Sequence, residues 1–303
     1  MYERILVPLD GSIMAENVLP FVEGISKRLG SEVILVSVFP EDKKVLDRPL
    51  RAYIEKRVSE LQALGVKASG MVVYGEDPAE EILALSEKIN AGLIALSAYG
   101  RSGTKWRLGG VPSKILQGTR IPLLLTRTFS FDEAMRQREF KKILVPLDGS
   151  KAAEDILPYV EEFLKGSDSE ILLLHVLESL RIPPYVESII EATMEPEERE
   201  NWKEQKEKER LEEAQGYLKE VADRLRERGL KVKETVKMGD IAELILSIAS
   251  EEKCDLLAIS SHGKQSGVTR WLFGDVAFKI IEGAMIPLFI LPKRKGLLFA
   301  EYH

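Results

Sequence analysis

The alternation of apolar and polar residues along the chain predicts a regular succession of strands and helices. Short apolar runs, typical of strands buried on both faces of a parallel sheet, alternate with segments whose apolar residues recur every three or four positions, as in amphipathic helices. In the first half the apolar runs lie at residues 5–7, 33–38, 71–74, 93–96 and 122–126. A second series follows in the same order. The pattern therefore predicts an α/β fold.

One stretch of eight residues occurs twice without a change. The sequence Ile-Leu-Val-Pro-Leu-Asp-Gly-Ser at Ile5–Ser12 returns at Ile143–Ser150. Its apolar residues predict a buried strand, and Pro-Asp-Gly-Ser suits a tight turn into a helix. We therefore expect two tandem doubly wound domains, each a five-stranded parallel sheet with helices on both faces. The expected boundaries are 1–128 and 142–303, with a linker at 129–141.

The two copies diverge after their second strands. Counterparts lie 138 positions apart up to Val38 but 164 positions apart at Gly65, so the second copy carries 26 extra residues. Much of this length is a highly charged run at 195–228, whose first part holds only Trp202 as a large apolar residue. A later stripe consists of Leu211, Ala214, Leu218, Val221 and Leu225, which predicts a helix that packs. The first part is interpreted as a solvated helical extension, with a partner-binding arm as the alternative.

Composition and charge argue against several classes of function and location. The net charge of −6 argues against non-specific binding to nucleic acid and to anionic membranes. No apolar run has the length of a membrane span, and the chain leads from Met1 straight into a strand, so we expect no signal peptide. The single Cys254 excludes an internal disulfide and is interpreted as a core residue in a reducing compartment. We therefore expect a cytoplasmic protein.

The candidate chemistry lies where the first and fourth strands end. Asp10 and Asp148 each follow a buried strand, and at the carboxyl edge of a parallel sheet they would face a ligand-binding crevice. A role as helix caps is an equally good interpretation. Right-handed crossovers bring the glycine-rich loop after the fourth strand to the same edge. Glycines let backbone N–H groups approach a phosphate, and the next helix adds its dipole. A merely tight connection would look similar.

These features resemble the universal stress protein family over nearly all of both halves. The resemblance rests on Val-Pro-Leu-Asp and its copy, on a glycine before the third helix of each half, and on the two loops. Nucleotide-binding members have Gly, two residues, Gly, nine residues, Gly, and then Ser or Thr. Here Ser97 and Ser260 replace the first Gly, and the longer spacer has eight residues in the first copy and ten in the second. Gly110 and Asp275 stand where Ser or Thr would be.

The resemblance implies a site for an adenine nucleotide, which is ATP, ADP or AMP, in each half and preferentially in the first. Asp10 would lie near the ribose, the backbone of Leu9 and Val38 near adenine, and the loop around the phosphates. The implied first-half residues are Pro8, Leu9, Asp10, Val38, Leu96, Ser97, Gly100, Arg101, Gly103, Gly109, Gly110 and Val111. The implied second-half residues are Pro146, Leu147, Asp148, Val176, Ser260, Gly263, Gly274, Asp275 and Val276.

Other polar and aromatic residues near these loops are assigned structural roles. His262 has no second ligand at metal-binding spacing, so we expect no metal site. His175 is interpreted as a hydrogen-bonded core residue, and Trp106 and Trp271 as anchors of the loops. Asp275 would lie where a phosphate is expected, and two charges about 4 Å apart repel by about 4 kcal/mol at a dielectric near 20. The second half should therefore hold triphosphate poorly.

Two function classes and a third possibility follow. The first is a stress-response protein that acts by binding nucleotide and by dimer-like pairing of its two halves, without catalysis. The second is a dimerisation or interaction module that has lost nucleotide binding, and the third is a slow ATPase. The apolar edge strands at 121–125 and 286–290 are expected to pair within the chain, because an open apolar edge invites aggregation. A further homodimer is compatible with this arrangement.

Overall fold

The structure is a computed structural model that describes residues 1–100, 108–128, 130–180, 182–261 and 274–292. The first half contains β1 (Arg4–Pro8), α1 (Ile13–Glu16), α2 (Leu19–Leu29), β2 (Glu32–Phe39), the 3-10 helix η1 (Glu41–Leu46), α3 (Arg48–Ala63), β3 (Lys67–Tyr74), α4 (Pro78–Lys88), β4 (Leu93–Ser97), α5 (Gly110–Gly118) and β5 (Leu123–Thr126). Helix α6 (Phe131–Gln137) lies between the halves. The second half contains β6 (Lys142–Pro146), α7 (Lys151–Glu154), α8 (Leu157–Leu164), β7 (Glu170–Leu177), α9 (Pro184–Thr193), α10 (Pro196–Glu227), β8 (Lys231–Met238), α11 (Ile241–Glu251), β9 (Leu256–Ser260), α12 (Asp275–Gly283) and β10 (Leu288–Leu291).

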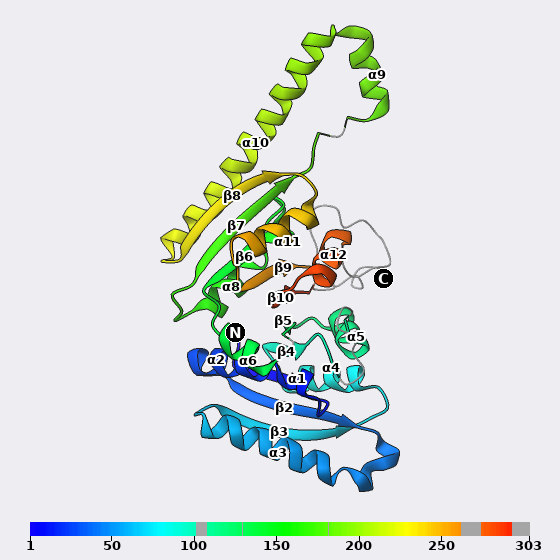
Figure 1. The fold of residues 1–303 in the computed structure, drawn as a ribbon, viewed down its shortest axis with the longest axis vertical. Helices are drawn as coiled ribbons and strands as arrows, with labels where there is room; N and C mark the ends of the chain where they lie inside the picture. Colours follow the sequence, from blue (N-terminus) through cyan, green and yellow to red (C-terminus); the bar gives the residue numbers. More distant parts are fainter. Residues whose placement is uncertain (101–107, 129, 181, 262–273, 293–303) are drawn as a thin grey trace, which may run out of the picture.

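All ten strands form one sheet in the order β3-β2-β1-β4-β5-β10-β9-β6-β7-β8 (Figure 1). The five strands of each half are parallel to one another, which confirms the predicted fold of two doubly wound units. At the centre, β5 pairs antiparallel with β10, with Leu124 opposite Phe289. Within the first half the carboxyl ends of β1 and β4 lie side by side, and within the second half those of β6 and β9 do.

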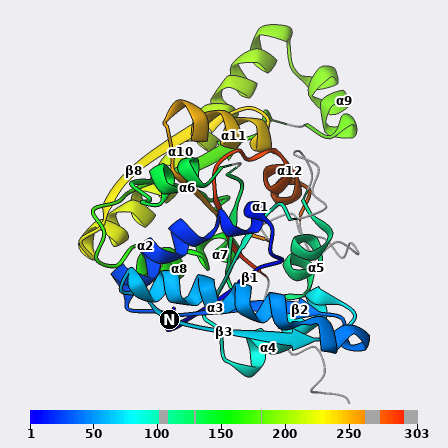
Figure 2. The same cartoon turned by 60° about the horizontal axis from the view of Figure 1, so that its bottom comes forward.

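Helices cover both faces of this sheet (Figure 2). Ile5 and Val7 of β1 belong to one core, together with buried residues of α2, α3, α8 and α10. Leu6, between them, belongs to the opposite core with residues of α4, α5, α11 and α12. Because successive side chains of a strand point to opposite faces, a strand covered on both sides must be apolar throughout. This explains the uninterrupted apolar runs.

The segment after each first strand differs from the prediction. The sequence predicts one helix kinked at Pro20 and another at Pro158, but the structure has two helices in each half, α1 with α2 and α7 with α8. Both prolines lie at the second residue of the later helix, where a missing N–H costs little. Asn17, in the first break, is buried and donates from Nδ2 to the carbonyl oxygen of Thr128 at 3.0 Å. The break between α1 and α2 therefore places the Asn17 side chain for a hydrogen bond with a residue that is distant in the sequence.

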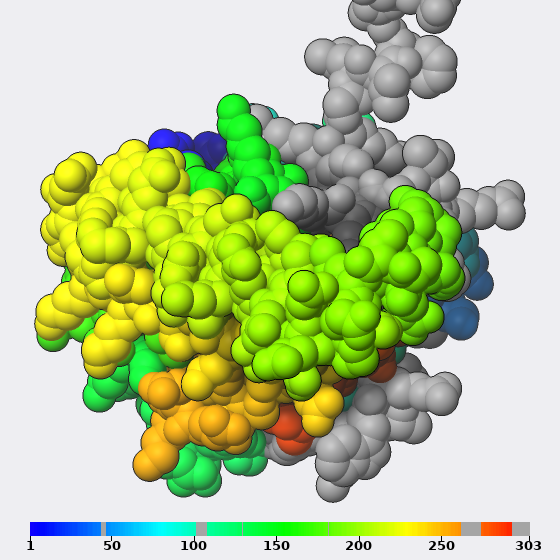
Figure 3. Space-filling view, turned by 90° about the horizontal axis from the view of Figure 1, so that it is seen from above, coloured from blue at the N-terminus to red at the C-terminus, as the bar shows by residue number. Residues whose placement is uncertain are grey.

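The charged run of the second half forms one long helix, α10. Its later part packs on the sheet through Ala214, Leu218, Val221 and Leu225, which confirms the predicted stripe except at Leu211, which is half-buried. Its earlier part extends beyond the sheet. Helix α9, which directly precedes α10 in the chain, lies at this outer end (Figure 1). We call residues 184–210 the arm. Seen from above, the arm crosses this end of the molecule (Figure 3).

Candidate functional site

The repeated Asp-Gly-Ser turn has the same hydrogen bonds in both halves. Asp10 Oδ1 accepts from the backbone N–H of Ser12 at 2.9 Å and from its hydroxyl at 2.6 Å. Asp148 accepts from Ser150 at 2.9 and 2.5 Å. The serines, rather than the aspartates, cap α1 and α7. The helix-cap interpretation of the aspartates is therefore wrong: each carboxylate orders the turn at the edge of the sheet.

In the first half the glycine-rich loop meets this turn. A Cβ atom on Gly100 would lie 2.8 Å from Oδ2 of Asp10, so the backbone approaches the carboxylate more closely than a side chain allows. Gly109 donates its N–H to the carbonyl oxygen of Ala98 at 2.9 Å and is the N-cap of α5. A Cβ atom on Gly110 would have no neighbour within 4 Å among the described residues. Among the described residues, no atom therefore occupies the place of a side chain at the first residue of α5.

Polar groups of two other predicted first-half residues are already hydrogen-bonded within the protein. The N–H of Leu9 donates to the carbonyl oxygen of Val36 at 2.8 Å, and the hydroxyl of Ser37 donates to the carbonyl oxygen of Leu9 at 2.5 Å. The hydroxyl of Ser97 accepts from the N–H of Tyr99 at 3.2 Å. The expected backbone contact of Leu9 with a base is therefore not available from its N–H.

The second half contains a cavity of about 350 Å³ at the carboxyl ends of β6, β7 and β9. This volume lies within the range of small-ligand sites. Eight predicted residues line it: Pro146, Leu147, Asp148, Val176, Ser260, Gly274, Asp275 and Val276. Asp275 is the first residue of α12, at the start of the helix after the loop, and it is exposed. The structure thus brings the Asp turn, the end of β9 and the start of α12 around one space.

The same cavity has wall residues that the sequence interpretation missed. Ile241 and Ile245 of α11 form part of the apolar side. His175 also lines the cavity and is half-buried, with its ring edge-on to Tyr217 at 5.9 Å, so its assignment to the core is wrong. Arg210, from the charged run that was interpreted as solvated, lines it as well. An apolar stripe is visible in a sequence, whereas a single inward cation within a charged helix is not.

Some predictions fall on residues outside the described part of the chain. These are Arg101 and Gly103 in the first loop and Gly263 in the second, together with Trp106, His262 and Trp271. Within the described residues, His, Cys, Asp and Glu form no group of three or more that could hold a metal ion. No helix in the same part of the chain combines the length and hydropathy of a membrane span.

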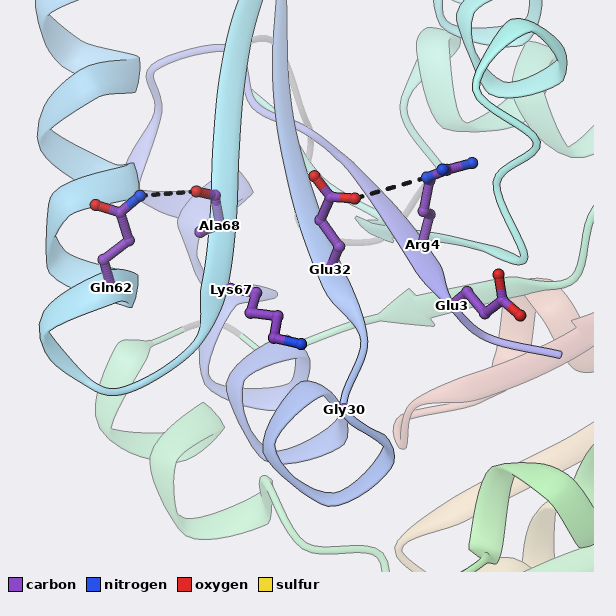
Figure 4. A pocket seen from close by; sticks show the side chains of 7 residues that line it. All are labelled: Glu3, Arg4, Gly30, Glu32, Gln62, Lys67 and Ala68. Atoms are coloured by element: carbon purple, nitrogen blue, oxygen red, sulfur yellow. Dashed lines mark hydrogen bonds and ion pairs between the residues drawn. The ribbon is translucent and has the colours of Figure 1, made fainter.

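A hollow of about 460 Å³ lies at the opposite, amino-terminal ends of β1, β2 and β3 (Figure 4). Arg4 Nε pairs with Glu32 at 3.6 Å on its rim, and the Gln62 side chain donates to the Ala68 carbonyl oxygen at 2.8 Å. Gly30 is part of its lining. In the second half the corresponding position is Asp168, which pairs with Lys231 at 2.5 Å. The hollow lies at the opposite end of β1 from the turn at Asp10.

Two doubly wound units with an Asp turn and a glycine-rich loop at the same sheet edge define a narrow class of α/β proteins. The family model of the universal stress protein family matches residues 1–127 and 139–292, and the chain belongs to this family as a tandem pair. Universal stress protein MJ0577 of Methanocaldococcus jannaschii is 31% identical over 162 residues, which are 52% of this chain and 97% of that protein. MJ0531 of the same organism is 29% identical over 175 residues, 57% of this chain and 95% of the relative.

A solved structure extends this likeness to both halves. The universal stress protein from Archaeoglobus fulgidus covers 97% of this chain and 100% of its own, with a TM-score of 0.71 and 20% identity. At this identity the likeness concerns the fold. The tandem arrangement of the whole chain therefore has a counterpart of known structure.

Proposed function

We propose that this protein binds an adenine nucleotide at the carboxyl ends of the parallel strands within its halves and acts in the stress response by binding and domain pairing rather than by catalysis. The observation that carries the proposal is the second-half cavity, around which eight residues expected from the sequence converge. The first half repeats its Asp turn, and there Gly100 approaches Asp10 closely. A helix N-terminus beside the turn suits a phosphate.

The direct test has two steps. The purified protein is denatured and the released small molecules are identified by mass spectrometry. Nucleotide-free protein is then titrated calorimetrically with ATP, ADP, AMP and cAMP, the last because one universal stress protein was solved in complex with it. We expect binding of at least one adenine nucleotide and no phosphate release on the timescale of the titration. Heat of binding for none of the four would leave the dimerisation module as the function, and steady phosphate release would favour the ATPase.

We further infer that the two sites prefer different ligands. Gly110 begins α5 without a side chain, whereas Asp275 puts a carboxylate at the same place on α12. Triphosphate should therefore bind mainly in the first half. Asp275→Ser should strengthen ATP binding by the second half by at least tenfold, because it removes repulsion at the phosphate position. Calorimetric stoichiometry checks this: we expect about one ATP per wild-type chain and about two for the variant. Two equal sites in the wild type would contradict it.

Domain pairing is the second part of the proposed function. The antiparallel pairing of β5 with β10 supports it, because it covers two apolar edges that would otherwise be open. Small-angle scattering should show one compact particle per chain at low concentration. Two separated bodies joined by a flexible linker would contradict domain pairing without bearing on nucleotide binding.

A further inference from the structure

Arg210 is a cation on α10 that lines the cavity of the second half. It lies on α10, ahead of the part that corresponds to α3. Buried Ile54 of α3 and buried Leu218 of α10 lie 164 positions apart, and the same offset aligns Arg210 with Leu46. In the sequence, leucine thus stands in the first half at the position where the second half has arginine. Arg210 is therefore a feature of this half alone.

The guanidinium group of Arg210 is held in place but only partly satisfied. Its Nη2 donates to the backbone carbonyl oxygen of Glu178, just after β7, at 3.0 Å. Its Nη1 is buried and has no hydrogen-bond partner among the described residues. Arginine stays protonated at all relevant pH values, so a buried guanidinium nitrogen without an acceptor is costly. Because Arg210 also lines the cavity, a ligand with an anionic oxygen there would complement the positive charge of this group.

The charges around the cavity favour one end for such an oxygen. Among the described lining residues, Arg210 is the one Lys or Arg, and the carboxylates are Asp148, Glu178 and Asp275. Asp275 begins α12, beyond β9, whereas Arg210 contacts the end of β7. Strand β6 lies between β7 and β9, so these flanks are about 10 Å apart, or two strand spacings. At the α12 flank a phosphate meets the carboxylate of Asp275, whereas at the β7 flank the guanidinium group of Arg210 offsets the carboxylate of Glu178.

We propose that the second cavity binds a nucleoside monophosphate with its phosphate on Arg210, at the β7 flank, rather than at the N-terminus of α12. A guanidinium group matches two phosphate oxygens through parallel N–H donors. Because Arg210 is the last residue of the arm, binding of the phosphate also restrains the arm. The proposal rests on the proposed function and specifies the ligand class, its orientation and its link to the arm.

The test uses the full chain with methyl-labelled isoleucine. Ile241, Ile245 and Ile280 line the second cavity, so their NMR signals follow its occupancy separately from that of the first half. AMP and adenosine are titrated into the wild type, into Arg210→Ala and into Lys208→Ala. Lys208 is the matched control, because it lies on the same helix with its side chain 76% exposed. Circular dichroism verifies that each variant is folded.

We expect Arg210→Ala to weaken AMP binding by about 10- to 100-fold, the range for a lost charge-assisted hydrogen bond. Adenosine, which lacks the phosphate, should bind the variant and the wild type within about twofold, and Lys208→Ala should match the wild type for both ligands. In the wild type, AMP should also slow amide hydrogen exchange in residues 184–210. This protection should be absent in Arg210→Ala.

The contrary outcomes separate this proposal from the general one. Equal AMP affinity of the wild type and Arg210→Ala overturns the role of Arg210, and so does an equal loss for AMP and adenosine. If calorimetry detects nucleotide but the three isoleucine signals do not move, the second-site assignment fails while the proposed function stands. If no nucleotide binds anywhere on the chain, both fail.

Discussion

At the scale of single residues, Gly109 limits the space in front of α5. A Cβ atom there would lie 3.3 Å from Cδ of Pro112 and 3.4 Å from the carbonyl oxygen of Ala98. Gly109→Val should therefore weaken ATP binding by the first half by at least tenfold, because the branched side chain would keep a phosphate away from the backbone N–H groups at the start of α5. Calorimetry with ATP measures the effect.

The control for this prediction is the same change in the other half. Gly274 caps α12 as Gly109 caps α5, and a Cβ atom on it would have no described neighbour within 4 Å. Gly274→Val should leave ATP binding by the first half within about twofold of the wild type. If both variants bind ATP like the wild type, the α5 N-terminus does not hold the phosphates.

Cys254 gives the folded protein an alkaline pH dependence. Burial raises the pKa of its thiol to about 11, against about 8.5 for an exposed thiol. The unfolded chain therefore loses this proton first, so stability is fully present below about pH 8.5 and declines as the pH rises toward 11. The loss from this group should reach about 3 kcal/mol.

The variant Cys254→Ala isolates this contribution. It should be less stable than the wild type at pH 7 because it leaves a small cavity, but it should lack the decline from the thiol. Denaturant unfolding at pH 7 and pH 10.5 should show the two proteins converging at the higher pH. A constant difference between them would mean that the thiol titrates alike in the folded and unfolded states.

At the scale of elements, two glycines make a matched pair for stability. A Cβ atom on Gly70 of β3 would collide with Ile54 of α3 and lie 2.8 Å from Cγ2 of Val58, both stiff, branched side chains. Gly70→Ala should destabilise the protein by about 1–3 kcal/mol. Gly216, within α10, is exposed with open space around it, so Gly216→Ala should stabilise by about 0.5–1 kcal/mol. Chemical unfolding measures both, and equal effects would contradict the packing of α3 on β3.

Element types could be predicted because each follows from a local period. The strand at residues 5–7, the cap-and-proline start of α4 at Asp77, and the packed stripe around Leu218 all carry such patterns. The break before α2 could not be predicted, because it depends on Asn17 finding a carbonyl 111 residues away. Arg210 was missed for a related reason: no local pattern distinguishes one inward cation among many solvated charges.

The candidate site was predictable to a similar extent. The octapeptide repeat and the spacing of the glycines locate the Asp turn and the helix start, and the structure brings these together. Neither pattern reports which backbone groups the sheet already uses. The N–H of Leu9 is taken by Val36, a pairing set by strand register rather than by any sequence motif.

At the scale of the whole molecule, the halves share one aromatic cluster beneath the paired edges. Phe163 of the second half lies between Tyr2 of the first, at 5.9 Å between ring centroids, and Phe289 of β10, at 5.0 Å. Phe21 stacks on Phe140 at 5.7 Å. The hydroxyl of Tyr2 also donates to the carbonyl oxygen of Tyr159 at 2.8 Å. The cores of the two halves are therefore continuous on this face.

Arg127 links the halves at the other face. It follows β5 directly, is only 4% exposed, and reaches the last turn of α12 in the second half. Its guanidinium group donates to the carbonyl oxygen of Glu282 at 3.1 Å and to that of Ile281. The final carbonyls of a helix have no partners within the helix, so a cation there both bonds them and complements the helix dipole. Pro292 follows β10 directly, as Arg127 follows β5. Its side chain has no hydrogen-bond donor, so it cannot make the equivalent contact with the first half.

The change Arg127→Met keeps the apolar stem of the side chain and removes its donors. It should lower the free energy of unfolding by about 2–4 kcal/mol, because two charge-assisted hydrogen bonds are lost and the carbonyl oxygen of Ile281 stays buried without its donor. The control is Arg120→Met, since Arg120 is exposed and its loss should cost less than about 0.5 kcal/mol. Guanidinium unfolding measures both, and hydrogen exchange should accelerate in α12 more than in α5 for Arg127→Met alone. If the two variants are equally stable, Arg127 does not hold the second half against the first, and the strand pair and aromatic cluster carry that contact by themselves.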